Sequence, residues 1–153
     1  MAGLDPVDRR LLEALRDNGR ASYAELARLV GMSPPSVQDR VRRLEERGVI
    51  TGYSASIAPE KLGLGMAALI GIHLSDTSDQ DAVARELARL VEVEDCWFVA
   101  GEESFVVKVR TADVAALERT LARLRGVRGI ARTRTTVVLS TRWEGRGAPP
   151  VGD

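Results

Sequence analysis

The sequence predicts an α+β protein with two domains, of which the first is helical and the second combines an antiparallel sheet with helices. Apolar residues recur at helical spacing through residues 1–50. After residue 65, apolar runs and helical patterns alternate in the order β-α-β-β-α-β. The stretch between them, PEKLGLG (59–65), contains a proline and two glycines and is typical of a linker.

The composition sets limits on function. The chain has 153 residues, and 22 basic residues balance 22 acidic ones, so net charge gives no argument for nucleic acid. Any DNA contact must therefore come from local placement of side chains. Cys96 is the only cysteine and lies in an apolar run, which predicts a buried thiol in a reducing compartment. We find no signal peptide and no apolar stretch of the roughly 18 residues that a membrane span needs, so we expect a cytoplasmic protein.

Three helices are expected in residues 1–50, each with a polar N-cap and a glycine that ends it. The caps are Asp5, Ser22 (in a capping box with Glu25) and Ser33; the glycines are Gly19, Gly31 and Gly48. The inward residues are predicted to be Val7, Leu11, Ala14 and Leu15, then Leu26, Leu29 and Val30, then Val37, Val41 and Leu44. A tight glycine turn between the last two helices indicates a helix-turn-helix, here called winged because the strand-like VITGYSASI (49–57) follows it.

The third helix carries polar side chains opposite its apolar stripe. Arginine can bind phosphate or guanine, and glutamine can pair with adenine, when such a helix enters the major groove. The candidate DNA-binding residues are Ser33, Pro35, Ser36, Gln38, Asp39, Arg40, Arg42 and Arg43. Arg40 lies nearer the core, so it is also expected to pair between helices. The alternative is a solvated helix whose arginines pair with neighbouring carboxylates, and charge alone favours that alternative.

The second domain is expected at residues 66–143, after a strand and linker at 51–65, and the order of its elements is that of a ferredoxin-like fold with an antiparallel sheet. We expect its strands in the spatial order 4-1-3-2. The helices should point Val83, Leu87, Leu90 and Val91, and then Val114, Leu117, Leu121 and Leu124, toward the sheet. The remaining residues, 144–153, are rich in Gly and Pro and predict a flexible tail.

Strands two and three flank AGEESF (100–105), which predicts a hairpin with a four-residue loop, Gly101 to Ser104. That register pairs Phe98 with Val107 and Cys96 with Val109. Facing partners share a side of the sheet, so one side should be apolar and covered by helices. The other side, with Asp95, Trp97, Lys108 and Arg110, should be available to a partner subunit.

Long stretches of the chain resemble the Lrp/AsnC family of bacterial and archaeal regulators. SPPSVQDRVRRLEERGVITGYSASIAPEKLGLG (33–65) looks like the family's recognition helix and linker, LDPVDRRLLEALRDNGRASYAELARLVGMS (4–33) is similar to its first two helices, and VRGIARTRTTVVL (127–139) resembles its C-terminal domain. The resemblance implies a sequence-specific transcriptional regulator without cofactor or catalytic activity. It further implies a homodimer, often assembled to an octamer, that binds pseudo-palindromic double-stranded DNA at the nucleoid and responds to an amino acid or related metabolite.

The resemblance also implies an effector site between dimers. Its residues here are Gly101, Glu102, Glu103, Ser104, Thr133 and Thr135, with His73 and Arg132 as expected neighbours by topology. Many members read TGxxDY at the loop, whereas this chain has Ala100, Ser104 and Phe105, so the carboxylate expected to hold the ammonium is missing. Either Glu102 or Glu103 replaces it, or the ligand is not an ordinary α-amino acid, or no ligand binds.

Two other functions remain open at this point. One is an architectural protein that wraps DNA without an effector. The other is an enzyme similar to the siroheme decarboxylases, which share the two-domain arrangement and are thought to use histidines. This chain has one histidine, His73, and one cysteine, from which neither a metal site nor a catalytic triad can be assembled.

Overall fold

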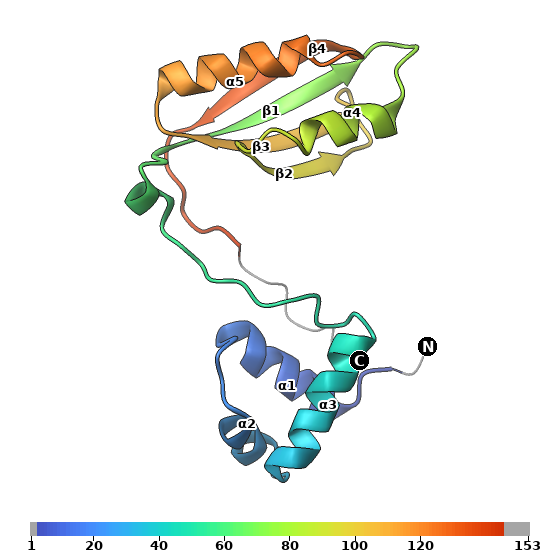
Figure 1. Ribbon diagram of the computed structural model, residues 1–153, viewed down its shortest axis with the longest axis vertical. Coiled ribbons are helices and arrows are strands. Elements are labelled where there is room, and N and C mark those ends of the chain that lie inside the picture. The colour runs from blue at the N-terminus through green and yellow to red at the C-terminus, as the bar shows by residue number, and fades with distance from the viewer. Residues whose placement is uncertain (1–2, 146–153) are drawn as a thin grey trace. The chain divides into compact units, whose positions relative to one another are not determined.

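The computed structural model describes residues 3–145 and divides into two units by internal contacts. The helical unit contains α1 (Pro6–Asp17), α2 (Tyr23–Val30) and α3 (Pro34–Glu46). The second unit, Ile57–Arg142, contains a 3₁₀ turn (Pro59–Leu62), β1 (Met66–Leu74), α4 (Gln80–Leu87), β2 (Val93–Phe98), β3 (Phe105–Thr111), α5 (Val114–Gly126) and β4 (Ile130–Val138) (Figure 1). The predicted α+β class is confirmed. Most of the expected tail, from residue 146 on, lies outside the described residues.

The predicted helix caps are present. The Asp5 carboxylate accepts a hydrogen bond from the Asp8 N–H at 2.8 Å. Ser22 and Glu25 form the capping box, in which Ser22 Oγ accepts from the Glu25 N–H at 3.2 Å and Glu25 Oε2 accepts from the Ser22 N–H at 2.7 Å. Gly31 ends α2 at φ 71°, a left-handed conformation that favours glycine. The boundaries of these helices are therefore set by local sequence.

The helical unit has a small shared core, and the predicted stripes of α1 and α3 lie in it. Leu11 of α1, Leu26 of α2, and Val37 and Val41 of α3 are all buried. The prediction for Leu29 was wrong, since its side chain is exposed and Ala27 is buried instead. Leu26, Ala27 and Val30 span one face of α2, and at 100° per residue Leu29 falls to the side of that face.

The strand expected in VITGYSASI does not form. Within residues 3–145, positions 51–58 belong to no helix or strand, because no neighbouring strand of the same chain supplies backbone partners for them. A side chain holds this segment to the helical unit instead, since Tyr53 Oη donates to Glu45 Oε1 at 2.8 Å. Desolvation, together with this hydrogen bond, raises the pKa of Tyr53 to about 12.

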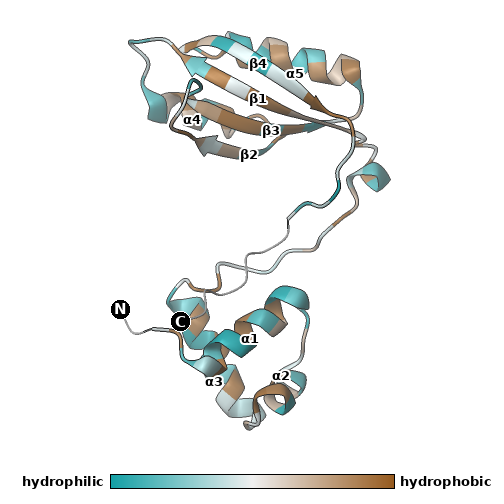
Figure 2. Ribbon diagram, turned by 180° about the vertical axis from the view of Figure 1, so that it is seen from behind, coloured by the Kyte–Doolittle hydropathy of each residue, from teal (hydrophilic) through white to brown (hydrophobic). Residues whose placement is uncertain are grey.

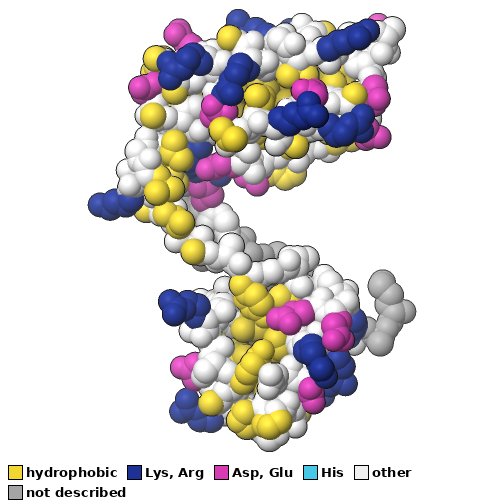
Figure 3. All heavy atoms as spheres, in the orientation of Figure 1, with side chains coloured by type: hydrophobic (Ala, Val, Ile, Leu, Met, Phe, Trp, Pro, Cys, Tyr) yellow, Lys and Arg dark blue, Asp and Glu magenta, His cyan; other side chains and the backbone are white. Residues whose placement is uncertain are grey.

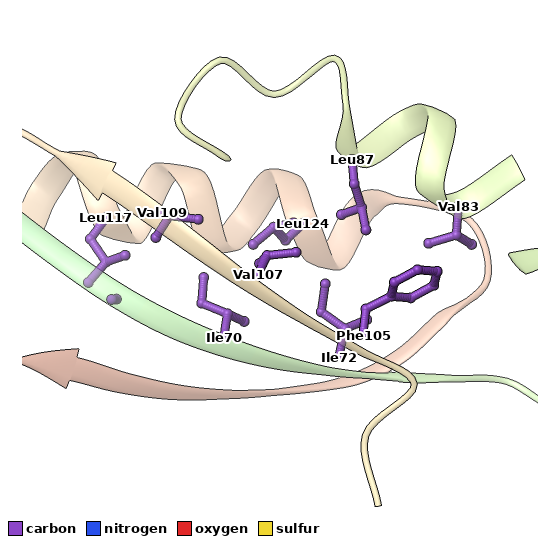
Figure 4. Close-up of a cluster of buried hydrophobic side chains, with 10 residues drawn as sticks. Ile70, Ile72, Val83, Leu87, Phe105, Val107, Val109, Leu117 and Leu124 are labelled. Carbon is purple, nitrogen blue, oxygen red and sulfur yellow. The ribbon is translucent and has the colours of Figure 1, made fainter. Parts of the chain in front are cut away.

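The sheet has the predicted topology, with antiparallel strands in the order β2-β3-β1-β4. Its two central strands, β1 and β3, are apolar along much of their length (Figure 2). Alternate residues of these strands pack beneath α4 and α5 (Figure 4). The buried cluster consists of Ala68, Ile70, Ile72, Val83, Leu87, Phe105, Val107, Val109, Leu117 and Leu124. The core of this unit therefore lies on one face of the sheet, and among the described residues no helix of this unit covers the other face.

The β2–β3 hairpin is wider than predicted. Phe98 pairs with Phe105 and Cys96 with Val107, so the loop runs through residues 99–104. Ser104 is bonded on both sides: its N–H donates to the Ile72 carbonyl of β1 at 2.8 Å, and its carbonyl accepts from the Val99 N–H at 3.0 Å. Because the register differs from the predicted one by two residues, the assignment of side chains to faces survives. The Phe98 and Phe105 rings, with centroids 5.2 Å apart, meet edge to face on the helix side.

The buried thiol was a wrong prediction, because Cys96 is exposed. It lies on the helix side of β2, but β2 is an edge strand and the helices cover the central strands. Partial desolvation nevertheless raises the pKa of the Cys96 thiol. Val91 and Val114 are exposed as well, contrary to prediction: α4 ends at Leu87, before Val91, and Val114 is the first residue of α5, outside the cluster.

No helix within residues 3–145 is both long and apolar enough to cross a membrane. No three His, Cys, Asp or Glu side chains there are grouped so as to hold a metal ion.

Candidate functional sites

The outward face of α3 is open to a partner. Seven of the eight candidate DNA-binding residues are exposed: Ser33, Pro35, Ser36, Gln38, Asp39, Arg42 and Arg43. At the N-terminal end of the helix, the Ser33 and Ser36 hydroxyls lie 2.8 Å apart and share a hydrogen bond. This end therefore presents small hydroxyl side chains ahead of the charged turn, a surface suited to close approach to DNA.

Arg40, the eighth candidate, is turned toward α1 as the sequence suggested. Its Nη1 donates to Asp5 Oδ2 at 2.6 Å and to Asp8 Oδ1 at 2.7 Å. The Arg40 side chain is 23% exposed and that of Asp8 only 11%. The Asp8 N–H, and after it Arg40, hold the pKa of Asp5 below its usual range. Arg40 thus fixes the orientation of α3 against α1.

The two remaining arginines of α3 differ in their partners. Arg42 Nη2 lies 3.0 Å from Asp39 Oδ1, and its Nε lies 3.9 Å from Glu46 Oε1. Both pairs are exposed, so they stabilise the helix little and can be released. The Arg43 side chain is exposed and forms no ion pair or hydrogen bond within residues 3–145. In Figure 3 each unit shows basic and acidic side chains intermingled on the visible face, in keeping with the zero net charge.

The hairpin loop carries the second candidate site. Gly101 and Glu102 are exposed, whereas Glu103 and Ser104 are half-buried. The Glu103 carboxylate forms an ion pair with the Arg134 guanidinium of β4. To do so its side chain crosses β1 at Gly71, where an added Cβ would stand 2.7 Å from Glu103 Cγ. The half-buried side chain of Glu103 thus joins the loop to the sheet.

Glu103 is held in its ionised form. A hydrogen bond from its own backbone N–H keeps the pKa of Glu103 below its usual range, and Arg134 and His73 add to this against partial desolvation. Arg132 of β4 approaches His73, its Nη2 lying 3.4 Å and 3.2 Å from the two ring nitrogens. One carboxylate, two guanidiniums and an imidazole therefore gather at this end of the open face, where both charges of a zwitterion could be met.

Thr133 and Thr135 do not belong to this group. They pair with Ile72 and Ile70, which face the helices, whereas Arg134 pairs with Gly71 on the open face. The sequence pattern placed the threonines by the end of the sheet at which they lie and did not identify Arg134 and Gly71, which contact Glu103. Strand alternation between β1 and β4 was the signal that could have identified them.

A helix-turn-helix with an open recognition face, followed by a ferredoxin-like unit with a charged loop site, defines a DNA-binding transcriptional regulator with a ligand-binding domain. Family models agree: residues 4–51 match a winged helix-turn-helix DNA-binding domain, and residues 67–148 match the Lrp/AsnC ligand binding domain. The chain belongs to the Lrp/AsnC family.

Individual relatives cover nearly the whole chain. The HTH-type transcriptional regulator LrpA of Mycobacterium tuberculosis is 46% identical over 143 residues, which cover 94% of this chain and 95% of LrpA. The regulatory protein AsnC of Escherichia coli K12 is 34% identical over 137 residues, or 89% and 90% of the two chains. Both are named as regulators, so the enzyme alternative is set aside.

Solved structures show the same fold. A feast or famine regulatory protein from M. tuberculosis, complexed with L-methionine, is 45% identical and superposes with a TM-score of 0.91. The match covers 97% of this chain and 100% of that one. E. coli AsnC is 33% identical with a TM-score of 0.89, and the match covers 97% of this chain and 99% of AsnC. A Neisseria meningitidis regulator in complex with L-Met is 27% identical with a TM-score of 0.88, and the match covers 93% of this chain and 94% of that one.

Arg40 gives the first prediction. Arg40→Gln leaves the buried Asp8 carboxylate without its cation and should lower the free energy of unfolding of the helical unit by about 2 kcal/mol at pH 7. Urea denaturation followed by circular dichroism measures this, with Arg43→Gln as the exposed control that changes nothing.

The same deficit should depend on pH. The folded pKa of Asp5 is depressed, so its contribution to stability is present above its unfolded pKa and is lost as the pH falls below about 4. An equal deficit at pH 7 and pH 3 would contradict this role for the ion pairs.

Proposed function

We propose that this regulator reads pseudo-palindromic double-stranded DNA with α3 and responds to a small molecule of the amino-acid class bound at the hairpin loop. Residues 1–50 would form the DNA-binding domain, 51–65 the linker, and 66–143 the domain for effector binding and assembly. The main support for DNA binding is the exposure of the candidate residues on α3. Arg40 pairs with Asp5 and Asp8 of the helical unit, and the other seven candidates are exposed. Such a protein would work in the cytoplasm, associated with the nucleoid.

The open face of the sheet supports assembly as a homodimer. Leu69 of β1 and Trp97 of β2 point to this face and are 39% and 47% exposed, respectively. Beside them Glu94 receives Lys108 Nζ at 2.5 Å and Arg110 Nε at 2.7 Å. Burial alone would raise the pKa of Glu94, but these two cations outweigh it and keep the pKa low. An apolar surface beside a satisfied ionic network suits a second copy of the chain; four such dimers would make the octamer.

Repetition of the helix-turn-helix compensates for its weak charge. Opposite the apolar stripe of α3, Arg42 and Arg43 are balanced by Asp39 and Glu46, so one copy gains little from phosphate attraction. Several copies on one assembly bind with a high effective concentration. A dimer would read half-sites about one helical turn apart, or a multiple of that distance.

For the effector, the loop geometry favours the first of the three possibilities. Glu103 is held against the sheet as an ionised carboxylate, whereas Glu102 is exposed. Ser104, where many members have aspartate, is used by the fold: its N–H and Oγ both bond to β1. Two related structures are complexes with L-methionine, which supports an amino-acid effector. Gly101 and Glu102 would border the site, and Thr133 and Thr135 would not.

Arg43→Gln tests the DNA-binding surface. Loss of one phosphate contact per helix should weaken binding to all sequences alike and reduce the slope of log K against log salt by about 1 for each engaged half-site. Fluorescence anisotropy with a palindromic duplex at several salt concentrations measures this. Arg119→Gln, on the exposed side of α5, is the matched control. Unchanged affinity and slope in Arg43→Gln would refute this placement of α3.

Leu69→Glu tests the dimer. A charge buried at the centre of the open face should shift the protein from dimer toward monomer in sedimentation velocity at micromolar concentration. Val91→Glu, which introduces the same charge at an exposed loop position, should leave the dimer intact. Dissociation in neither variant would place the interface elsewhere.

A further inference from the structure

The exposed face of α3 has an acidic residue at its centre. The buried stripe of this helix consists of Val37, Val41 and Leu44. At about 100° per residue, Asp39 lies almost opposite the middle of that stripe, and its side chain is 64% exposed. When such a helix enters the major groove, a carboxylate at this position comes close to the bases and to the flanking phosphates. Left unpaired, it would repel DNA of any sequence.

Arg42 lies one turn after Asp39 and neutralises it. The Arg42 Nη2 donates to Asp39 Oδ1 at 3.0 Å, and its Nε lies 3.9 Å from Glu46 Oε1. Arg42 therefore has one carboxylate a turn before it and another a turn after it. The side chain of the next residue, Arg43, forms no ion pair within the described range 3–145. Two adjacent arginines of one helix thus differ in charge environment, since the first is balanced and the second is not.

The charge environment decides what Arg42 can bind. A phosphate that drew Arg42 away from Asp39 would leave this carboxylate unpaired beside the DNA backbone, so a phosphate contact gains little. The edge of a guanine makes no such demand. Asp39 accepts from one N–H group of the guanidinium, and the remaining donors can reach guanine O6 and N7. Asp39 can itself accept from the N4 amino group of cytosine. The two side chains together are complementary to G·C base pairs and not to phosphate.

We propose, on the basis of the DNA-binding function above, that the Asp39–Arg42 pair is a specificity determinant of this regulator: it reads a G·C base pair in the major groove of each half-site, and Asp39 keeps Arg42 from binding phosphate. Arg43 supplies affinity that is independent of sequence. Holding the guanidinium in place before DNA arrives also lowers the entropy cost of fixing a long side chain. Because the pair is exposed, its loss should change DNA binding and leave the stability of α3 nearly unchanged.

The test begins with the full-length wild type selecting duplexes from a randomised pool, which supplies a preferred DNA site. We expect a G·C pair at one fixed position of each half-site. Fluorescence anisotropy then compares the selected duplex with one in which that pair is replaced by A·T, and the wild type should bind the selected duplex about tenfold more tightly. In Arg42→Ala this ratio should fall to about one. The matched variant Arg43→Ala should weaken binding to both duplexes and keep the ratio.

Asp39→Asn tests the carboxylate separately. It frees Arg42 for phosphate, so binding to the A·T duplex should become tighter and the specificity ratio should fall. The slope of log K against log salt should steepen by about 1 for each engaged half-site. Glu46→Gln removes the same charge from the same helix but leaves the hydrogen bond of Asp39 intact, so it should keep the ratio.

The outcomes separate this inference from the DNA-binding function on which it rests. If the wild type selects a sequence whose preference survives in Arg42→Ala or in Asp39→Asn, the pair is not the reader, and DNA binding by α3 stands. Loss of the ratio in Arg43→Ala would overturn the division of roles between the two arginines. If the wild type selects no sequence from the pool, sequence-specific binding and this inference both fail.

Discussion

The alternation of side chains along β1 is the constraint on which most of the second unit depends. Ala68, Ile70 and Ile72 point under the helices and form the centre of the core. The residues between them point the other way, and Gly71 is one of these. Across the sheet it stands in a row with Trp97, Val106 and Arg134, which the pairing of all four strands places on one side. One strand thus organises the core on one face and borders the candidate effector site on the other.

In the helical unit, an ion-pair cluster rather than a strand decides which residues face inward and which stay exposed. Arg40 is the cation of α3 that faces inward, and Asp5 and Asp8 on α1 receive it. Asp5 is also the N-cap of α1, so the residue that begins this helix also orients α3. Holding α3 with one arginine leaves the others for a partner. In the helical unit, therefore, a charged side chain that looks functional in the sequence has a positional role, and its neighbours carry the exposed chemistry.

Local signals in the sequence were enough to predict the helices and the order of the strands. The capping box of Ser22 and Glu25 and the left-handed Gly31 depend only on residues close in sequence, and they appear as expected. The register of the hairpin involves β1, a distant strand, because the Ser104 N–H donates to the Ile72 carbonyl while the Ser104 carbonyl accepts from the Val99 N–H. No local pattern contains that information. The exposure of Cys96 has a similar origin, since a strand's place at the edge of the sheet is a property of the whole fold.

The geometry of the candidate loop site depends on the folded sheet for the same reason. The family's loop motif led to the expectation of a carboxylate at 104, and the structure instead holds the carboxylate of Glu103 against the sheet while Ser104 bonds to β1. Thr133 and Thr135 lie at the right end of the sheet but on its helix side, whereas Arg134 between them reaches the loop. Whether a given residue of a strand points to the helices or to the open face depends on the strand register. The register is known only once the sheet has formed.

Hydrogen–deuterium exchange with and without L-methionine tests the central claim most directly, because it locates the ligand on the intact protein. Binding at the hairpin loop predicts slower exchange in peptides that cover residues 99–105 and 131–135. Slowing confined instead to residues 75–86, which border a separate hollow between the start of α4 and Gly129, would contradict the claim, as would slowing at neither place.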